Sequence, residues 1–188
     1  VKVDASTIKD AAPDVVVLAT GILKSDSSIP VSGDKAVLNL EEAAAAKVEG
    51  PVCIVGDNLR ATDYANFLVE QGISVNLVHE GTKEELAADQ APWPRAVMIS
   101  LLEGRGVRLN HEASDISVKE DGVHFVSGCG LECVELAQTV VLCNNIAPNA
   151  ALADELKDIC EVVRIGDCDR PSNIMNAVTS GNLVARSI

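Results

Sequence analysis

The residues whose types and spacing point most clearly to chemistry lie between positions 52 and 61. An apolar run, Val52–Val55, ends at Gly56, and the segment 56–61 (Gly-Asp-Asn-Leu-Arg-Ala) leads into a helical pattern. In the fingerprint G-x-G-x-x-G/A, glycines let the backbone approach a pyrophosphate that rests on the N-terminus of the following helix. Because Gly56 and Ala61 match its first and third positions, the segment is predicted to be a dinucleotide-type turn.

The same turn departs from the fingerprint at its second position. Asn58 replaces the glycine that permits the closest backbone approach, and Asp57 adds a carboxylate where a ligand anion would lie. A carboxylate near a helix N-terminus is stabilised by the helix dipole. Asp57 is therefore able to fill the phosphate position, with Arg60 offsetting its charge. Two interpretations stay open: a working pyrophosphate site, and a turn whose anion position is filled by the protein itself.

The second half of a dinucleotide site is expected at the end of the next strand, 73–78. An acidic residue there typically binds the adenine-ribose hydroxyls of NAD. Counting from Val75 puts His79 in that position, with Glu80 just beyond it. Glu80 favours NAD, whereas Lys83 is near enough to contact the additional phosphate of NADP. The choice between NAD and NADP therefore stays open.

No other group of residues forms a catalytic or metal-binding pattern. The six cysteines include no C-x-x-C pair, and a zinc or iron–sulfur site normally needs four ligands with close paired spacing. No metal site is predicted, and buried free thiols are expected. His79, His111 and His124 are scattered, so no Ser-His-Asp triad can be assembled and the catalytic residues stay unknown.

The elements that would position these residues alternate between short strands and helices. Strands are expected at 14–19, 52–55, 73–78, 106–109, 139–143 and 162–165, and helices at 40–47, 60–71, 94–103, 150–156 and 173–187. Residues 22–38 are expected to form a loop. Asp121-Gly122 between two alternating runs, with a further strand near 132–135, predicts a three-stranded antiparallel meander. The fold class is therefore α/β, a Rossmann-like doubly wound parallel sheet with a β-meander.

Composition excludes several classes of function. The net charge of -13 over 188 residues argues against binding to nucleic acid or to an anionic membrane surface. The apolar run 15–19 is too short to cross a bilayer, and no basic leader precedes it, so a cytoplasmic protein is expected. Because the chain begins with Val1, we expect a processed chain or a fragment of a longer one.

Two flanking motifs make a family resemblance specific. Residues 14–21, which end in Ala-Thr-Gly, resemble a strand of flavoproteins that bind two dinucleotides. Residues 165–177 resemble their C-terminal flavin motif, in which an Asp follows a Gly at a strand end. Taken in order with the central turn, the motifs resemble the C-terminal FAD/NAD(P)-binding region of the NADH:flavin oxidoreductase family over essentially the whole chain. That family includes 2,4-dienoyl-CoA reductase, enoate reductase and trimethylamine dehydrogenase.

The resemblance implies a domain organisation and a set of cofactors. Residues 1–25 and 148–188 would be parts of an FAD-type domain, and residues 26–147 an inserted NAD(P)-type Rossmann domain, which makes the fold one of the FAD/NAD(P)-binding type. The implied cofactors are NAD(P)H and FAD in the full-length parent. The implied partner is the rest of that polypeptide, a TIM barrel with FMN and an iron–sulfur cluster. The implied cofactor-binding residues are Thr20, Gly21 and Asp167 near the flavin, and Gly56, Asp57, Asn58, Ala61, His79 and Glu80 near NAD(P)H.

The resemblance also has gaps. The chain contains neither the barrel, nor the four-cysteine cluster motif, nor the first glycine-rich loop that would hold the FAD pyrophosphate. Residues 143–149 lack the glycine of a second Ala-Thr-Gly-like turn and have Asn144 and Asn145 instead. The resemblance favours a nucleotide-binding module that passes a hydride from NAD(P)H toward FAD in the full-length enzyme; the alternative is a degenerate structural or regulatory module that binds ADP or nothing. We expect the isolated chain to show no turnover, because the FAD loop and the barrel are missing from it. We also expect it to self-associate, because its FAD-type strands have lost their neighbours.

Overall fold

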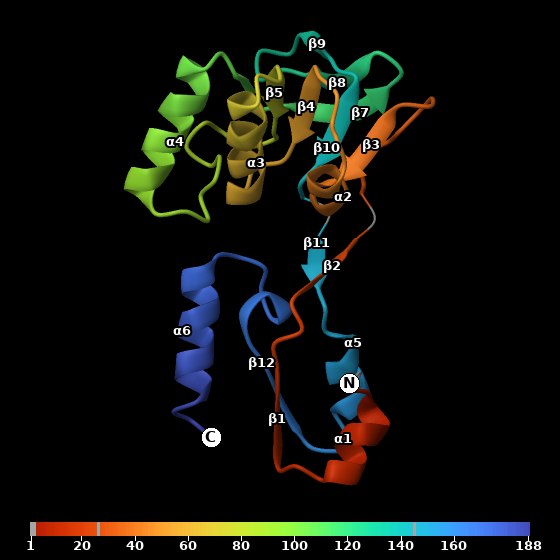
Figure 1. Cartoon of the computed structure of the whole chain (residues 1–188), viewed down its shortest axis with the longest axis vertical. Helices are drawn as coiled ribbons and strands as arrows, with labels where there is room; N and C mark the ends of the chain where they lie inside the picture. The colour runs from red at the N-terminus through yellow and green to blue at the C-terminus, as the bar shows by residue number, and fades with distance from the viewer. Residues whose placement is uncertain (1–2, 26, 145) are drawn as a thin grey trace. The chain divides into compact units, whose positions relative to one another are not determined.

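The structure, a computed structural model, describes residues 3–25, 27–144 and 146–188 (Figure 1). The chain divides into two compact units. Unit 1 comprises residues 1–25 and 146–188, and unit 2 comprises residues 26–145. Asn145, which the sequence links to a degenerate site, lies outside the described residues. Among the described residues, no helix has the length and apolar character needed to cross a membrane.

Unit 2 is built on a five-stranded parallel sheet. Its spatial order is β3 (Ala36–Asn39), β10 (Thr139–Leu142), β4 (Val52–Val55), β5 (Val75–Val78) and β6 (Arg108–Asn110). Every residue of β4 and β10 is buried, as expected for central strands that are covered on both faces. The chain runs outward from β4 through β5 to β6 and later returns to the other side of β4 with β10. The order therefore reverses between β4 and β10.

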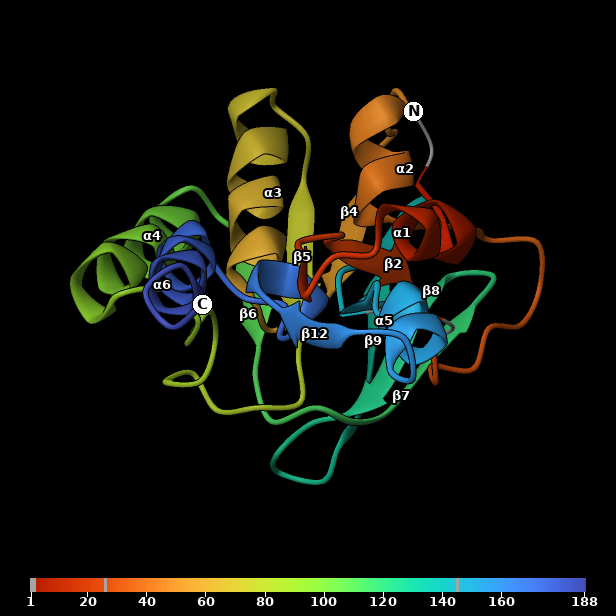
Figure 2. The same cartoon turned by 90° about the horizontal axis from the view of Figure 1, so that it is seen from below.

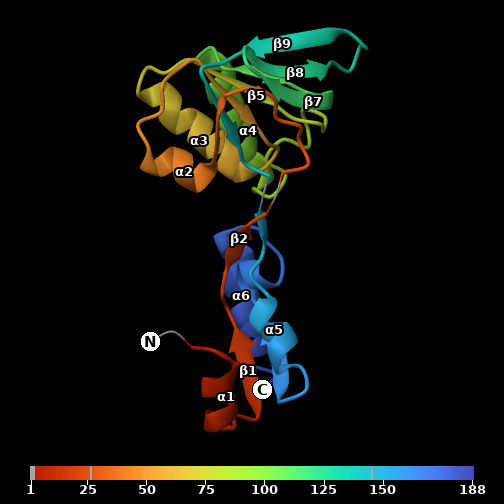
Figure 3. The ribbon, with the colours of Figure 1, turned by 90° about the vertical axis from the view of Figure 1, so that its right-hand side faces the viewer.

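Different layers cover the two faces of this sheet (Figure 2, Figure 3). One face carries the helices α2 (Leu40–Ala45), α3 (Leu59–Glu70) and α4 (Pro92–Gly104). The other carries the antiparallel meander β7 (Ser114–Lys119), β8 (Gly122–Val126) and β9 (Glu132–Leu136). An apolar cluster that includes Ile54, Leu68 and Leu77 packs the helices on the sheet. A second cluster, which includes Val118 and Val140, packs the meander on it.

Unit 1 contains two small sheets. β1 (Val15–Leu18) pairs in parallel with β12 (Glu161–Arg164), and β2 (Ile22–Lys24) pairs antiparallel with β11 (Ile146–Pro148). The remaining elements are α1 (Ala5–Ala11), α5 (Ala151–Leu156), the 3-10 turn η1 (Gly166–Cys168) and α6 (Ile174–Val184). No residue of α6 is fully buried, and its large apolar side chains Ile174, Met175, Val178 and Leu183 are exposed.

The predicted fold class is confirmed: a parallel sheet with helices and a three-stranded antiparallel meander. The prediction of a loop over 22–38 was wrong, because β2 and most of β3 lie there. Both strands are short, and their partners β11 and β10 lie more than a hundred residues further along the chain, so local periodicity does not reveal the pairing. The assignment of the two units to an FAD-type and an NAD(P)-type domain stays a prediction.

Candidate functional site

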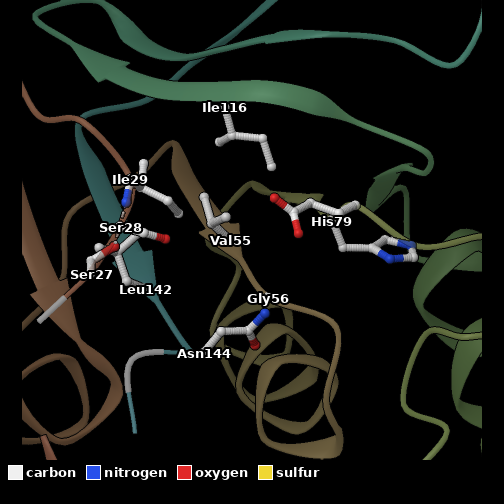
Figure 4. A pocket seen from close by; sticks show the side chains of 10 residues that line it. Ser27, Ser28, Ile29, Val55, Gly56, His79, Ile116, Leu142 and Asn144 are labelled. Carbon is white, nitrogen blue, oxygen red and sulfur yellow. Dashed lines mark hydrogen bonds between the residues drawn. The ribbon is translucent and has the colours of Figure 1, made fainter. Parts of the chain in front are cut away.

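A pocket of about 180 Å³ lies in unit 2 at the carboxyl ends of β4, β5 and β10 (Figure 4). This is where the strand order reverses, the place at which open α/β sheets bind their ligands. Its wall is partly apolar and partly polar: Ser27, Ser28, Ile29, Val55, Gly56, His79, Glu80, Ile116, Leu142 and Asn144. Three of the predicted site residues, Gly56, His79 and Glu80, are thus brought together. The volume is below the roughly 300–1,000 Å³ of typical ligand pockets, so a whole dinucleotide does not fit inside it.

Gly56 opens the predicted turn beside this pocket. A Cβ atom at this position would lie 2.8 Å from the Cβ of Cys143 and 3.4 Å from that of Ala61. The glycine is therefore required because the turn packs tightly on β10 and on the first turn of α3. This packing accounts for Gly56 and Ala61 without a ligand.

Asn58 occupies the position of the missing second glycine and acts as the N-cap of α3. Its Oδ1 accepts a hydrogen bond from the Ala61 N–H at 3.0 Å. Its Nδ2 donates to the Cys143 carbonyl at 3.2 Å and to the Asn144 Oδ1 at 3.1 Å. Asparagine is among the strongest N-cap residues. The side chain therefore satisfies the helix terminus and ties the turn to the end of β10.

A carboxylate does lie at the N-terminus of α3, but it belongs to Asp89 and not to Asp57. The Leu59 N–H donates to the Asp89 Oδ1 at 2.8 Å. Asp57 takes part through its backbone, with its N–H donating to the Asn144 Oδ1 at 3.3 Å and its carbonyl accepting from the Ala87 N–H at 2.5 Å. Nothing in the local sequence identifies Asp89, because it lies 30 residues after Leu59 in a turn-rich segment.

The two cations that the sequence places near the site have other partners. The Arg60 guanidinium forms an ion pair with Glu41, and the Lys83 ammonium forms one with Glu103. Both pairs are partly exposed, where an ion pair contributes little to stability. Arg60 thus pairs with Glu41 of α2, and Lys83 pairs with Glu103 of α4.

His79 is a buried link between β5 and the segment after β6. The residue is 2% exposed, and its Nε2 lies 2.6 Å from the His111 Nδ1. Its N–H donates to the Asn110 carbonyl, and its own carbonyl accepts from Ala113. Burial, followed by the neighbouring His111, lowers the pKa of His79 to about 4, so its ring is neutral near pH 7. Glu80, the next residue, is exposed at the pocket and is the better placed of the two to meet a ligand.

The predicted flavin-side residues of unit 1 are held together by hydrogen bonds. The Thr20 hydroxyl lies 2.5 Å from the Asn149 carbonyl and 3.0 Å from the Cys168 thiol. The Asn149 side chain donates to the Thr20 carbonyl, and its N–H donates to the Gly21 carbonyl. The Ala-Thr-Gly segment and the Gly-Asp-Cys turn, far apart in the sequence, therefore meet inside unit 1.

Asp167 lies in η1, next to Cys168. Its Oδ1 accepts a hydrogen bond from the Ser172 N–H at 3.0 Å. The carboxylate thereby orders the segment that leads into α6, whose N-cap is Asn173. A contact from Asp167, Thr20 or Gly21 to a flavin stays a prediction.

The cysteines and other potential ligands give no metal centre in the described part of the chain. No group of three or more His, Cys, Asp and Glu side chains lies close enough together there to hold a metal ion. All six cysteines are free thiols. Burial raises the pKa of Cys143 to about 12, so this thiol is protonated and inert.

Two backbone N–H groups at the turn of unit 2 are not free for the pyrophosphate of NAD(P)H. A diphosphate needs free backbone N–H groups at the helix N-terminus and a glycine that lets it approach. Here the Leu59 N–H is bonded to Asp89, and the Ala61 N–H is bonded to Asn58. Two of the donors at this helix terminus, the Leu59 and Ala61 N–H groups, therefore already have protein acceptors, one of them a carboxylate.

Known proteins show what this arrangement is similar to. No protein-family model matches the chain. The chain is 29% identical to NADH oxidase of Thermoanaerobacter brockii, in an alignment that covers 100% of this chain and 30% of that protein. It is also 29% identical to bilirubin reductase of Mediterraneibacter gnavus, in an alignment that covers 97% of this chain and 28% of that protein. Among solved structures it is similar to a 2-naphthoyl-CoA reductase complex, with 26% identity, a TM-score of 0.83, and coverage of 100% of this chain and 29% of that one. The resemblance to the NADH:flavin oxidoreductases is confirmed.

A further neighbour shows the fold alone. Histamine dehydrogenase from Rhizobium sp. 4-9 has a TM-score of 0.79 at 16% identity, with 31% of its chain covered. The chain thus spans about 30% of the length of these relatives. The chain is therefore similar in fold to one part of these longer proteins.

Proposed function

We propose that the chain is the nucleotide-binding-type region of a longer flavin-dependent oxidoreductase, and that its unit 2 is a structural Rossmann module that does not bind NAD(P)H. The oxidoreductase names of the relatives support the first part. The hydrogen bond from the Leu59 N–H to Asp89 carries the second part, because it gives the anion position of the turn to the protein's own carboxylate.

Transfer of a hydride from NAD(P)H toward FAD in the full-length enzyme is the competing function. Two observations favour it: the relative named NADH oxidase, and Glu80, exposed at a pocket where the strand order reverses. The hydrogen-bonded turn weighs against it, because the Leu59 and Ala61 N–H groups already have protein acceptors. We therefore rank it second.

For unit 1 we propose a place in the FAD-type domain of the parent. The contact between Thr20 and Cys168 brings the Ala-Thr-Gly and Gly-Asp-Cys segments to one site, which supports a role for Thr20, Gly21 and Asp167 near FAD. The rest of the longer polypeptide, with a barrel that carries FMN and an iron–sulfur cluster, is the proposed partner.

Calorimetric titration of the 188-residue chain with NADH, NADPH, FAD and ADP tests the role of unit 2. We expect no saturable heat with NADH or NADPH from protein whose circular dichroism shows it to be folded. Asn58→Trp is the matched variant, because it places a bulky side chain in the turn. Saturable NADH binding that Asn58→Trp weakens would contradict the structural role and favour hydride transfer.

A further inference from the structure

The segment that follows Glu80 turns back across the Gly56–Ala61 turn and is held there by packing and by a hydrogen bond. Leu86 and Ala87 are both 0% exposed, and the Ala87 N–H donates to the Asp57 carbonyl at 2.5 Å. Ala87 has a φ of 53°, in the left-handed region that alanine seldom adopts. Packing therefore imposes this conformation and places Asp89, two residues further on, at the first turn of α3.

The turn is closed from a second direction by the residue that follows β10 and Cys143. The Asn144 Oδ1 accepts hydrogen bonds from the Asp57 N–H and from the Asn58 Nδ2. The backbone and the cap of the turn are thus held by Asn144 on one side and by Asp89 on the other. Both acceptors come from segments distant in sequence, so the closure is a property of the fold and not of the turn alone.

Two carboxylates lie at this terminus, together with the Arg60 guanidinium, which pairs with Glu41. Asp57 is exposed in the turn itself, and Asp89 lies on the helix end. Burial and then the negative charge of Asp89 raise the pKa of Asp63, so the Asp89 charge reaches the next turn of α3. A phosphate entering here has to displace the Asp89 carboxylate or lie beside it, and like charges side by side are strongly unfavourable.

We propose that Asp89 determines the ligand specificity of unit 2 by standing in for a phosphate at the N-terminus of α3, so that phosphate-bearing ligands are excluded from the neighbouring pocket. This inference rests on the proposed structural role and deepens it by naming the residue responsible. Asp89 acts through the negative charge that it places beside the Leu59 N–H, which repels a second anion. Removing its charge while keeping its shape restores affinity for phosphate.

Asp89→Asn is the decisive variant, with ADP as the phosphate probe and adenosine as the probe without phosphate. The amide oxygen of the introduced asparagine still accepts from the Leu59 N–H, so the fold is retained while the charge is lost. Asp63→Asn is the matched control, because it removes a carboxylate within electrostatic range of Asp89 but not at the helix terminus. Calorimetry of the full chain, with thermal unfolding to verify the fold, gives the affinities.

We expect ADP to bind Asp89→Asn at least about tenfold more tightly than wild type, with adenosine unchanged and with no gain for Asp63→Asn. If Asp89→Asn does not fold, Asp89→Ser provides the same test, since a serine hydroxyl also caps helices. A folded variant that binds ADP no better than Asp63→Asn, or that gains as much for adenosine as for ADP, overturns the inference. NADH binding by the wild-type chain would instead contradict the proposed function of unit 2, whatever the Asp89→Asn variant shows.

Discussion

At the scale of single residues, His79 links the stability of the protein to pH. The residue is 2% exposed, and its pKa is lowered from 6.5 to about 4, mainly by burial and then by His111. The unfolded chain binds a proton below pH 6.5, whereas the folded chain does so only near pH 4. Stability is therefore fully present above pH 6.5 and is lost as the pH falls from there toward 4.

We expect the free energy of unfolding to fall by about 2 kcal/mol between about pH 7.5 and about pH 5 through His79. Urea denaturation at the two pH values measures this fall. His79→Asn should lessen the fall. An equal fall in the wild type and in His79→Asn would show that another group carries the pH dependence.

Residue chemistry was predictable where it is local. The Gly56–Ala61 turn, its asparagine at the second position and the open choice about its anion were all visible in the sequence. The carboxylate that fills the anion position was not, because Asp89 reaches Leu59 only through the packing of Leu86 and Ala87. A contact over 30 residues leaves no mark on spacing or periodicity.

At the scale of elements, the meander is joined to the parallel sheet by a buried carboxylate. Glu135 on β9 is 5% exposed and accepts hydrogen bonds from Asn76 on β5 at 2.6 Å and from Asn110 on β6 at 3.2 Å. Arg108 supplies the ion pair at 3.2 Å. A buried charge is tolerated only when its neighbours satisfy it in this way.

Glu135→Ala should therefore destabilise the protein by about 3 kcal/mol, because it leaves two amide groups without their acceptor and opens space beneath the meander. Glu135→Gln, which keeps the shape and one acceptor oxygen, should cost about 1 kcal/mol. Chemical denaturation of both variants measures the difference. Equal stabilities would mean that the network is not what joins β9 to the sheet.

The elements themselves were predictable to different degrees. Long apolar or amphipathic runs, such as those of β4 and α3, were predicted within one residue of their bounds. β2, β3 and β11 have only three or four residues each and owe their existence to partners far along the chain. Their stability comes from tertiary pairing, which the sequence pattern does not display.

At the scale of the whole molecule, the two units differ in how much of their apolar surface is covered. The parallel sheet of unit 2 is covered on both faces, whereas unit 1 has a two-stranded parallel sheet and a helix, α6, with no buried residue. Ile174, Met175 and Val178 are 85%, 73% and 66% exposed. A two-stranded sheet is marginal by itself in water. In a longer protein, further elements of an FAD-type domain would cover this surface.

When such elements are absent, the exposed face of α6 should drive self-association of the 188-residue chain. Light scattering over a concentration series should show the mean mass rising above that of the monomer.

The pair Ile174→Glu and Val178→Lys lies four residues apart on α6, so it removes the apolar contact while adding a favourable ion pair. Val97→Glu with Leu101→Lys is the matched control on α4, where both side chains are also exposed. Only the α6 pair should restore the monomer, because only there is a whole helix left without a buried residue among the described helices. Association that survives the α6 pair and disappears with the α4 pair would instead assign the contact to unit 2.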